Sequence, residues 1–208
     1  MKIVVCFLSF LFAFSVGLNA ERDCGWVDLI TEDLSNFETS GNWKVDDAGV
    51  LTLEPREGES GWKRYDAYLW LKEEYADFEM SLEFNLVKGG NSGLFFRVFD
   101  KGSPVKKGME VQIRDGMKKG GKPGPHDMGG IIKLQGETKY NLNPPGKWNT
   151  MTVKAVGQDV TISINGEVVN EVDLSKGDRK DHPLTGYISL QDHGGPLTFR
   201  NVKLKELK

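Results

Sequence analysis

A strict two-residue alternation constrains this chain more than any other feature of its sequence. Residues 78–86 read FEMSLEFNL, so every second side chain is apolar and each one between is polar. Successive side chains of a β-strand point to opposite faces of the sheet, whereas a helix would space its apolar positions three and four residues apart. The pattern therefore predicts a strand that buries one face and leaves the other in water.

Weaker forms of this alternation recur along the chain. They predict further strands at 91–99, 109–114, 148–156, 160–164, 167–172, 187–190 and 197–204. Asn165-Gly166 separates two of these strands and is the residue pair that a tight two-residue hairpin turn prefers. Long stretches of helical periodicity are missing and turn residues recur at short intervals, which favours an all-β sandwich or barrel.

The first twenty residues have the pattern of a secretory signal peptide. A basic start, Met1-Lys2, precedes an apolar run from Ile3 to Leu18, and Ala20 offers a small residue for cleavage. An uncleaved membrane anchor is the alternative, but the apolar run is short for one. We expect cleavage after Ala20, export to the periplasm or the extracellular space, no membrane span afterwards, and one domain over residues 21–208.

Charge and cysteine content exclude several classes of function. The formal net charge of the 208-residue chain is −3 and it has no basic stripe, so we expect no nucleic-acid partner. The basic cluster within residues 118–125 stands among glycines and prolines, as in a surface loop. Removal of the signal peptide would take away Cys6 and leave Cys24 alone, which excludes an internal disulfide.

Polar side chains gather on two of the predicted strands. On strand 91–99, one face carries Leu94, Phe96 and Val98 and is predicted to be core, and the other carries Gly93, Phe95, Arg97 and Phe99. On strand 109–114, the polar face carries Glu110, Gln112 and Arg114. If the two strands are neighbours, Arg97 can meet Glu110 or Gln112. That contact would be either a structural ion pair or part of a sugar site with an aromatic floor.

A third polar group follows the strand at 187–190. Gln191, Asp192 and His193 stand on a glycine-rich turn, where they can converge on a ligand. Asp192 either orients the imidazole or caps the turn.

Motifs of several common enzyme classes are missing. The three histidines are widely scattered without the spacing of paired metal ligands, so we expect no cofactor and keep a divalent metal as a minor alternative. Phosphate-binding loops, dinucleotide motifs and a Gly-x-Ser-x-Gly elbow do not occur. Residues 110–115 loosely resemble the acidic strand of retaining glucanases, which needs two carboxylates about 5 Å apart. Gln112 stands where the middle aspartate would be, so ordinary two-carboxylate hydrolysis is not expected.

Several stretches together carry a resemblance to a known family. They are, in order, GWVDL at 25–29, YADFE at 75–79, GGNSGLFFR at 89–97, MEVQI at 109–113, GKWNT at 146–150, LQDHG at 190–194 and FRNV at 199–202. With them the chain resembles the 3-keto-disaccharide hydrolase domain family. The resemblance implies a concanavalin A-like jelly roll, a sandwich of two antiparallel sheets. It also implies hydrolysis of glycosides whose sugar is already oxidised to a ketone at carbon 3.

The implied chemistry needs three groups. A ketone at carbon 3 acidifies the proton on carbon 2, and its removal gives an enolate that can expel the glycosidic oxygen from carbon 1 before water adds. This requires a base, a stabiliser for the enolate oxygen and an acid for the leaving group. We hypothesise that Arg97 stabilises the enolate, that Glu110 is the base and that His193 is the acid or a second base. The expected substrate-binding residues are Asn91, Phe95, Gln112, Gln191 and Asp192.

Two non-catalytic functions are alternatives. The enzyme hypothesis expects Arg97, Glu110 and His193 to face one cleft, and expects Arg97→Ala to lose turnover while it stays folded. A lectin-like carbohydrate-binding module of the cell envelope would instead pair Arg97 with Glu110 and turn His193 away. A structural or adhesion domain of the envelope would have no common pocket.

Overall fold

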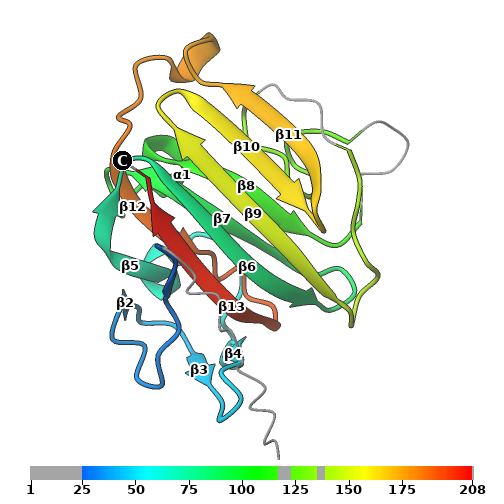
Figure 1. Ribbon diagram of the computed structural model, residues 1–208. Helices are drawn as coiled ribbons and strands as arrows, with labels where there is room; N and C mark the ends of the chain where they lie inside the picture. The colour runs from blue at the N-terminus through cyan, green and yellow to red at the C-terminus, as the bar shows by residue number, and fades with distance from the viewer. Residues whose placement is uncertain (1–24, 117–122, 135–138, 208) are drawn as a thin grey trace, which may run out of the picture.

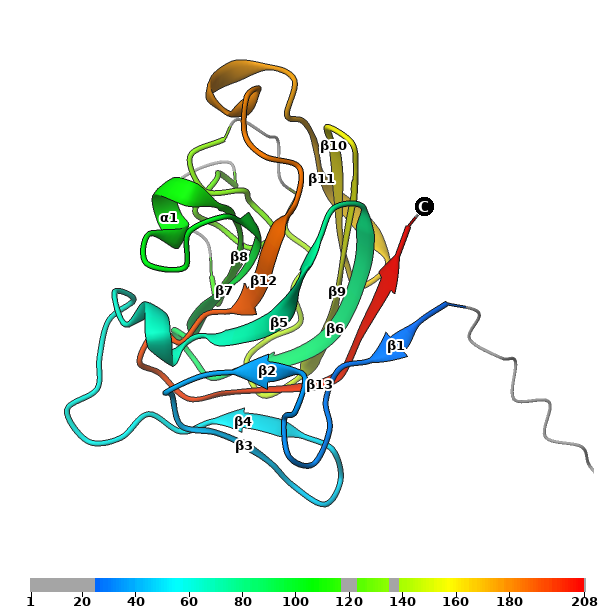
Figure 2. The same ribbon diagram turned by 90° about the vertical axis from the view of Figure 1, so that its left-hand side faces the viewer.

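Two antiparallel β-sheets pack face to face in the computed structural model, which describes residues 25–116, 123–134 and 139–207 (Figures 1 and 2). The predicted signal peptide, Cys24 and the basic residues at 118–122 lie outside the described residues. The larger sheet contains β1 (Val27–Asp28), β3 (Trp43–Val45), β4 (Leu51–Leu53), β6 (Phe78–Leu86), β9 (Trp148–Val156), β10 (Asp159–Ile164), β11 (Glu167–Asp173) and β13 (Leu197–Glu206). The smaller sheet contains β2 (Phe37–Glu38), β5 (Leu69–Tyr75), β7 (Asn91–Val98), β8 (Met109–Arg114) and β12 (Gly186–Leu190).

Strands that are neighbours in each sheet are often distant in the sequence. The smaller sheet has the order β2-β5-β12-β7-β8, and the larger has β11-β10-β9-β6-β13-β4-β3 with β1 beside β13. These crossing connections between two antiparallel layers confirm the predicted jelly-roll sandwich. The described helices are short: α1 (Pro104–Lys107) and the 3₁₀ turns η1 (Tyr65–Ala67) and η2 (Gly177–Arg179). Within the described ranges, no helix has the length and apolar character needed to cross a membrane.

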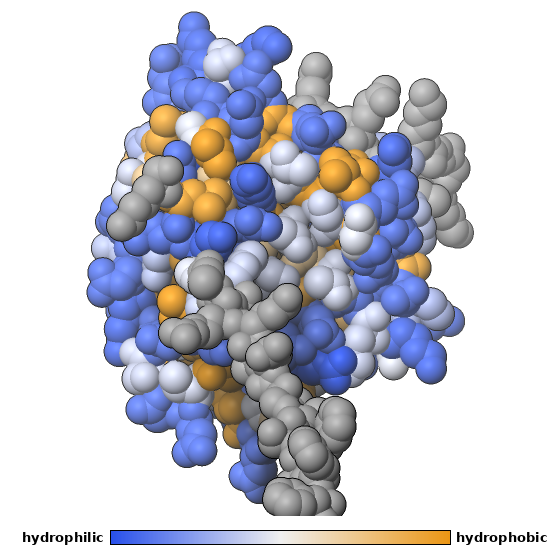
Figure 3. Space-filling view, in the orientation of Figure 1, coloured by the Kyte–Doolittle hydropathy of each residue, from blue (hydrophilic) through white to orange (hydrophobic). Residues whose placement is uncertain are grey.

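The two-residue alternation of residues 78–86 is the pattern of burial in β6. The strand runs from Phe78 to Leu86 as predicted, with every apolar side chain buried and every polar one partly exposed. Phe78 meets Phe96 of the other sheet in an edge-to-face contact with ring centroids 6.1 Å apart. Figure 3 shows the outer face of the larger sheet, most of which hydrophilic side chains cover.

The predicted hairpin turn joins β10 to β11. Asn165 and Gly166 have φ angles of 51° and 80°, the left-handed conformation that a type I′ turn needs at both positions. The pair therefore fixes where this hairpin reverses.

A β-bulge in β7 overturns the predicted face of Arg97. Against β12, Tyr187 pairs with Val98 and Ser189 with Phe95, so β7 holds one residue more than its partner. Arg97 lies in this bulge with a φ of 50°. Beyond the bulge the alternation is shifted, so Val98 shares the face of Phe95 and not that of Leu94.

The buried guanidinium of Arg97 points to the ends of the larger sheet. It donates to the carbonyl oxygen of Gly157 at 2.7 Å and to that of Ala76 at 3.2 and 3.3 Å, and Asp77 lies 3.4 Å away. Those residues form the turns between β9 and β10 and between β5 and β6. The predicted contacts of Arg97 with Glu110 or Gln112 are wrong, because the bulge turns the arginine towards these turns.

Candidate active site

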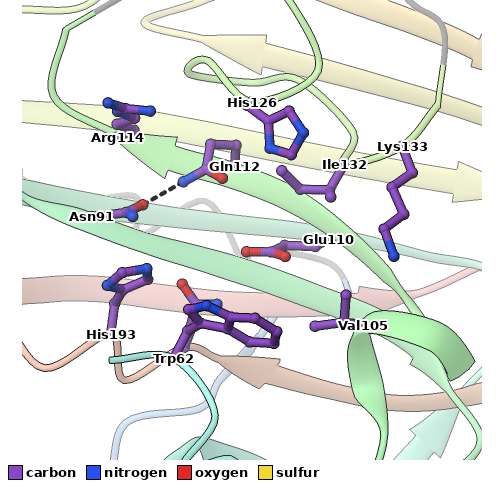
Figure 4. A pocket seen from close by; sticks show the side chains of 11 residues that line it. Trp62, Asn91, Val105, Glu110, Gln112, Arg114, His126, Ile132, Lys133 and His193 are labelled. Carbon is purple, nitrogen blue, oxygen red and sulfur yellow. Dashed lines mark hydrogen bonds between the residues drawn. The ribbon is translucent and has the colours of Figure 1, made fainter. Parts of the chain in front are cut away.

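A cavity of about 410 Å³ opens on the outer face of the smaller sheet (Figure 4). Its floor follows the register of β7 and β8, in which Asn91 pairs with Arg114, Gly93 with Gln112 and Phe95 with Glu110. Its rim comes from segments outside the strands. The lining residues are Trp62, Asn91, Val105, Glu110, Gln112, Arg114, His126, Ile132, Lys133, Gln191 and His193.

Glycine at position 93 makes room for the Glu110 carboxyl group. A Cβ atom placed on Gly93 would lie 2.4 Å from Oε1 of Glu110, well inside contact distance. The carboxyl group therefore reaches across β7 over a position that has no side chain. Any larger residue at 93 would displace it.

Burial makes Glu110 a proton donor at neutral pH. The side chain is buried, and desolvation raises the pKa of its carboxyl from 4.5 to about 8, against the opposing effects of the Gln191 amide and the positive charge of Lys133. The protonated form therefore predominates at pH 7.

The pKa of His193 is shifted in the opposite direction. Partial burial lowers the pKa of its imidazole, and the nearby Arg114 guanidinium lowers it further, while a backbone hydrogen bond and Asp192 act to raise it. The imidazole is therefore neutral at pH 7 and can accept a proton. Two titratable groups with oppositely shifted pKa values in one cavity are the arrangement that acid–base catalysis uses.

An amide pair fixes the polar end of the cavity. Nε2 of Gln112 donates to Oδ1 of Asn91, shown dashed in Figure 4, and to the carbonyl oxygen of Ser92 at 3.0 Å. These bonds occupy the N–H donors of the Gln112 amide and the carbonyl oxygen of the Asn91 amide. The Gln112 carbonyl oxygen and the Asn91 amide group can then serve the hydroxyl groups of a ligand.

Buried polar contacts connect the segment that carries Trp62 to the turn that carries His193. Tyr68 donates its hydroxyl to the carbonyl oxygen of Trp62 at 2.6 Å and accepts from Nε2 of Gln191 at 3.0 Å. Nη2 of Arg64 lies 2.7 Å from Oδ1 of Asp192. The rim is therefore held by Gln191, which lines the cavity, and by Arg64, Tyr68 and Asp192, which do not.

Five of the eight predicted site residues lie together in this cavity: Asn91, Glu110, Gln112, Gln191 and His193. Three predicted placements are wrong. Arg97 bonds to the β9–β10 turn and to the β5–β6 turn that joins the two sheets, and Phe95 is fully buried beneath Tyr68 with ring centroids 5.5 Å apart. Asp192 is buried outside the cavity lining, where it pairs with Arg64 and accepts from the Gly194 amide at 2.8 Å.

The structure also brings in cations that the sequence hypothesis did not use. Arg114 shares the polar face of β8 with Glu110 and Gln112, and that shared face was the signal for it. Lys133 comes from an irregular segment with no periodicity to reveal it. Either can supply the positive charge that Arg97 was expected to supply. Among the described residues, no group of three or more His, Cys, Asp or Glu side chains could hold a metal ion.

One known domain family matches most of this chain. The sequence profile of the 3-keto-alpha-glucoside-1,2-lyase-like domain matches residues 25–205. A Bacteroides thetaiotaomicron protein named 3-keto-disaccharide hydrolase is 26% identical over 172 aligned residues, and the alignment covers 64% of this chain but only 59% of that protein.

Two solved structures from Parabacteroides distasonis, both provisionally named glycosyl hydrolases, are also similar. One is 30% identical with a TM-score of 0.72, and covers 88% of this chain and 99% of that one. The other is 22% identical with a TM-score of 0.73, over 88% and 95% of the two chains, and shows the shared fold alone.

Proposed function

The chain belongs to the 3-keto-alpha-glucoside-1,2-lyase-like domain family, and from this premise we propose that it hydrolyses glycosides whose sugar carries a ketone at carbon 3. The similarity to a 3-keto-disaccharide hydrolase supports this substrate class. The observation that carries the proposal is the joint presence of Glu110 and His193 in one cavity, with oppositely shifted pKa values.

The protonation states at pH 7 set the direction of proton transfer. Neutral His193 is the base for the proton on carbon 2, and protonated Glu110 is the acid for the glycosidic oxygen. We assign stabilisation of the enolate oxygen at carbon 3 to Arg114, and its electrostatic effect on His193 supports this role. This assignment exchanges the roles that the sequence hypothesis gave to Glu110 and His193, and replaces Arg97 with Arg114.

The reaction then balances without any further reactant but water. His193 removes the proton from carbon 2, and the electron pair of that bond moves to the carbon 3 oxygen as an enolate. The enolate re-forms the ketone, a double bond forms between carbons 1 and 2, and the leaving oxygen takes the Glu110 proton. Water then adds to carbon 1 and gives a proton to Glu110, while His193 returns its proton to carbon 2.

Incubation with a 3-keto-disaccharide and with its unoxidised parent tests the proposal. We expect release of 3-keto-glucose from the first and no cleavage of the second. Cleavage of the parent alone would indicate an ordinary glycosidase. Binding of both sugars in calorimetry without cleavage of either would indicate a carbohydrate-binding module.

Hydrogen exchange at carbon 2 separates the two roles. In heavy water, Glu110→Gln should still exchange the carbon 2 proton of the ketosugar but lose glycoside cleavage, because the base remains and the acid is gone. His193→Gln should lose both. Glu32→Gln, at an exposed position away from the cavity, is the matched control and should retain both. Exchange that survives in His193→Gln would refute its role as base.

A further inference from the structure

The cavity has a polar end and an apolar end, with Glu110 at the boundary. Asn91, Gln112 and Arg114 occupy the first two cross-strand levels of β7 and β8. At the next level Glu110 pairs with Phe95, which belongs to a buried apolar cluster with Tyr68, Trp70 and Val98. Val105 of α1 packs on that cluster and also lines the cavity. The chemical character of the floor therefore changes along the strand direction.

The segment that follows β8 repeats this change of character. Gln112 donates its backbone N–H to the Gly130 carbonyl oxygen at 2.8 Å, and the Ile132 N–H donates to the Glu110 carbonyl oxygen at 2.9 Å. Side chains that are directly opposite in an antiparallel pair share a face. Gly130 therefore adds no side chain beside Gln112, where a Cβ atom would meet the Gly124 carbonyl oxygen at 2.5 Å. Ile132, in contrast, places an apolar side chain beside Glu110.

Figure 4 shows the result around the carboxyl group. His193, Asn91, Gln112 and Arg114 lie on one side of Glu110, and Val105, Ile132 and Lys133 lie towards the other, with Trp62 below. A sugar ring with several hydroxyl groups fits the polar end, where amides and charges can bond to it. At the other end, hydroxyl groups would lie against the side chains of Val105 and Ile132, which offer them no hydrogen bond, and burial of unpaired hydroxyl groups is unfavourable. Lys133 is the charged group on that side, at the rim.

We infer that the leaving group of the substrate is an aromatic or similarly planar apolar aglycone, bound between Trp62, Val105 and Ile132. The inference rests on the proposed function, because the acid Glu110 must face the bond between sugar and leaving group. With the sugar at the polar end, the leaving group then extends over the apolar end. An aromatic ring there also suits the ammonium group of Lys133 at the rim, since cations are attracted to ring faces.

Benzyl and methyl 3-keto-glucosides of both anomeric configurations provide the test, because their leaving alcohols differ in apolar surface far more than in acidity. We expect kcat/KM for the benzyl glycoside to exceed that for the methyl glycoside by about tenfold or more, the range that an apolar pocket gives. The ratio should fall severalfold in Val105→Thr and in Ile132→Thr, each of which replaces apolar side-chain surface with a hydroxyl-bearing one. Val156→Thr, an exposed valine on the larger sheet, is the matched control and should keep the wild-type ratio.

The outcomes separate this inference from the proposed function. Equal rates for the two glycosides, or a 3-keto-disaccharide cleaved faster than the benzyl glycoside, would overturn the inference and leave 3-keto-glycoside hydrolysis in place. A wild-type preference that both threonine variants retain, with unchanged unfolding temperatures, would also overturn it. Failure to cleave any 3-keto-glycoside would overturn both.

Discussion

Replacement of Arg97 by methionine should destabilise the fold and spare the chemistry. Methionine keeps most of the buried volume but removes the donors to the carbonyl oxygens of Ala76 and Gly157 and the partner of Asp77. A hydrogen bond from a charged group contributes about 1.5–3 kcal/mol, and breaking a buried ion pair costs about 3–5 kcal/mol. The Asp77 side chain is 34% exposed and regains water, so its pairing adds little. The bonds to the two carbonyl oxygens then dominate, and the combined loss should be about 3–6 kcal/mol.

Urea unfolding followed by tryptophan fluorescence measures this loss. Total stabilities of about 5–15 kcal/mol make a change of that size large, and the unfolding temperature should fall by about 10 °C. Arg97→Lys should give a smaller loss, because its ammonium group keeps the positive charge. A loss should remain, because one ammonium cannot reproduce the fork of donors between two carbonyl oxygens. Arg56→Met, which removes an exposed arginine from a surface ion pair with Glu59, is the control and should cost less than about 1 kcal/mol.

The reasoning would be refuted by Arg97→Met unfolding at the wild-type urea concentration. A stable variant with no turnover per folded molecule would instead return the arginine to catalysis, as the sequence hypothesis had it.

Three further predictions concern the cavity. Turnover of a 3-keto-glycoside should have a bell-shaped pH profile. The acidic limb follows protonation of His193, whose pKa lies below its usual 6.5, and the basic limb follows Glu110 near its pKa of about 8; a basic limb that persists in the residual activity of Glu110→Gln would contradict this. The stability of the fold should also depend on the ionisation of Glu110. Its raised pKa means that the folded state binds the Glu110 proton more tightly than the unfolded state does. That contribution to stability is present below pH 4.5 and is lost as the pH rises through about 8. The free energy of unfolding of Glu110→Gln, measured in urea, should therefore rise relative to that of the wild type between those pH values. Gly93→Ala places a methyl group 2.4 Å from the present position of the Glu110 Oε1 atom and should lower kcat by about tenfold to a hundredfold; an unchanged kcat would show that the carboxyl group is not held in place there.

Period-two patterns predicted much of the fold and part of the site for one physical reason. A strand with one buried face must alternate, so β6, β8 and β9 could be delimited from the sequence, and the shared face of Glu110 and Gln112 followed from counting. The same counting failed at Arg97, because one extra residue in the left-handed conformation shifts every later side chain. An arginine in a sequence does not predict the left-handed conformation, which is expected at glycine or asparagine.

Residues of the rim could not be predicted by periodicity at all. Trp62 and Ile132 stand in irregular segments, and hydrogen bonds outside the regular strand pairing place them. The Tyr68 hydroxyl donates to the Trp62 carbonyl oxygen, and the Ile132 N–H donates to the Glu110 carbonyl oxygen. These bonds depend on the completed sandwich and leave no local pattern.

The bulge in β7 also shapes the cavity. Without the extra residue, Val98 would face the core and Arg97 would project on the face of Phe95. With it, the guanidinium bonds to the β5–β6 and β9–β10 turns, and Val98 joins Phe95 in the apolar cluster on which Val105 packs. Gly186 of β12 permits this arrangement, because a Cβ atom there would lie 2.6 Å from the carbonyl carbon of Arg97. Arg97 therefore contributes to the apolar end of the cavity through the course of its backbone, although its side chain never reaches the site.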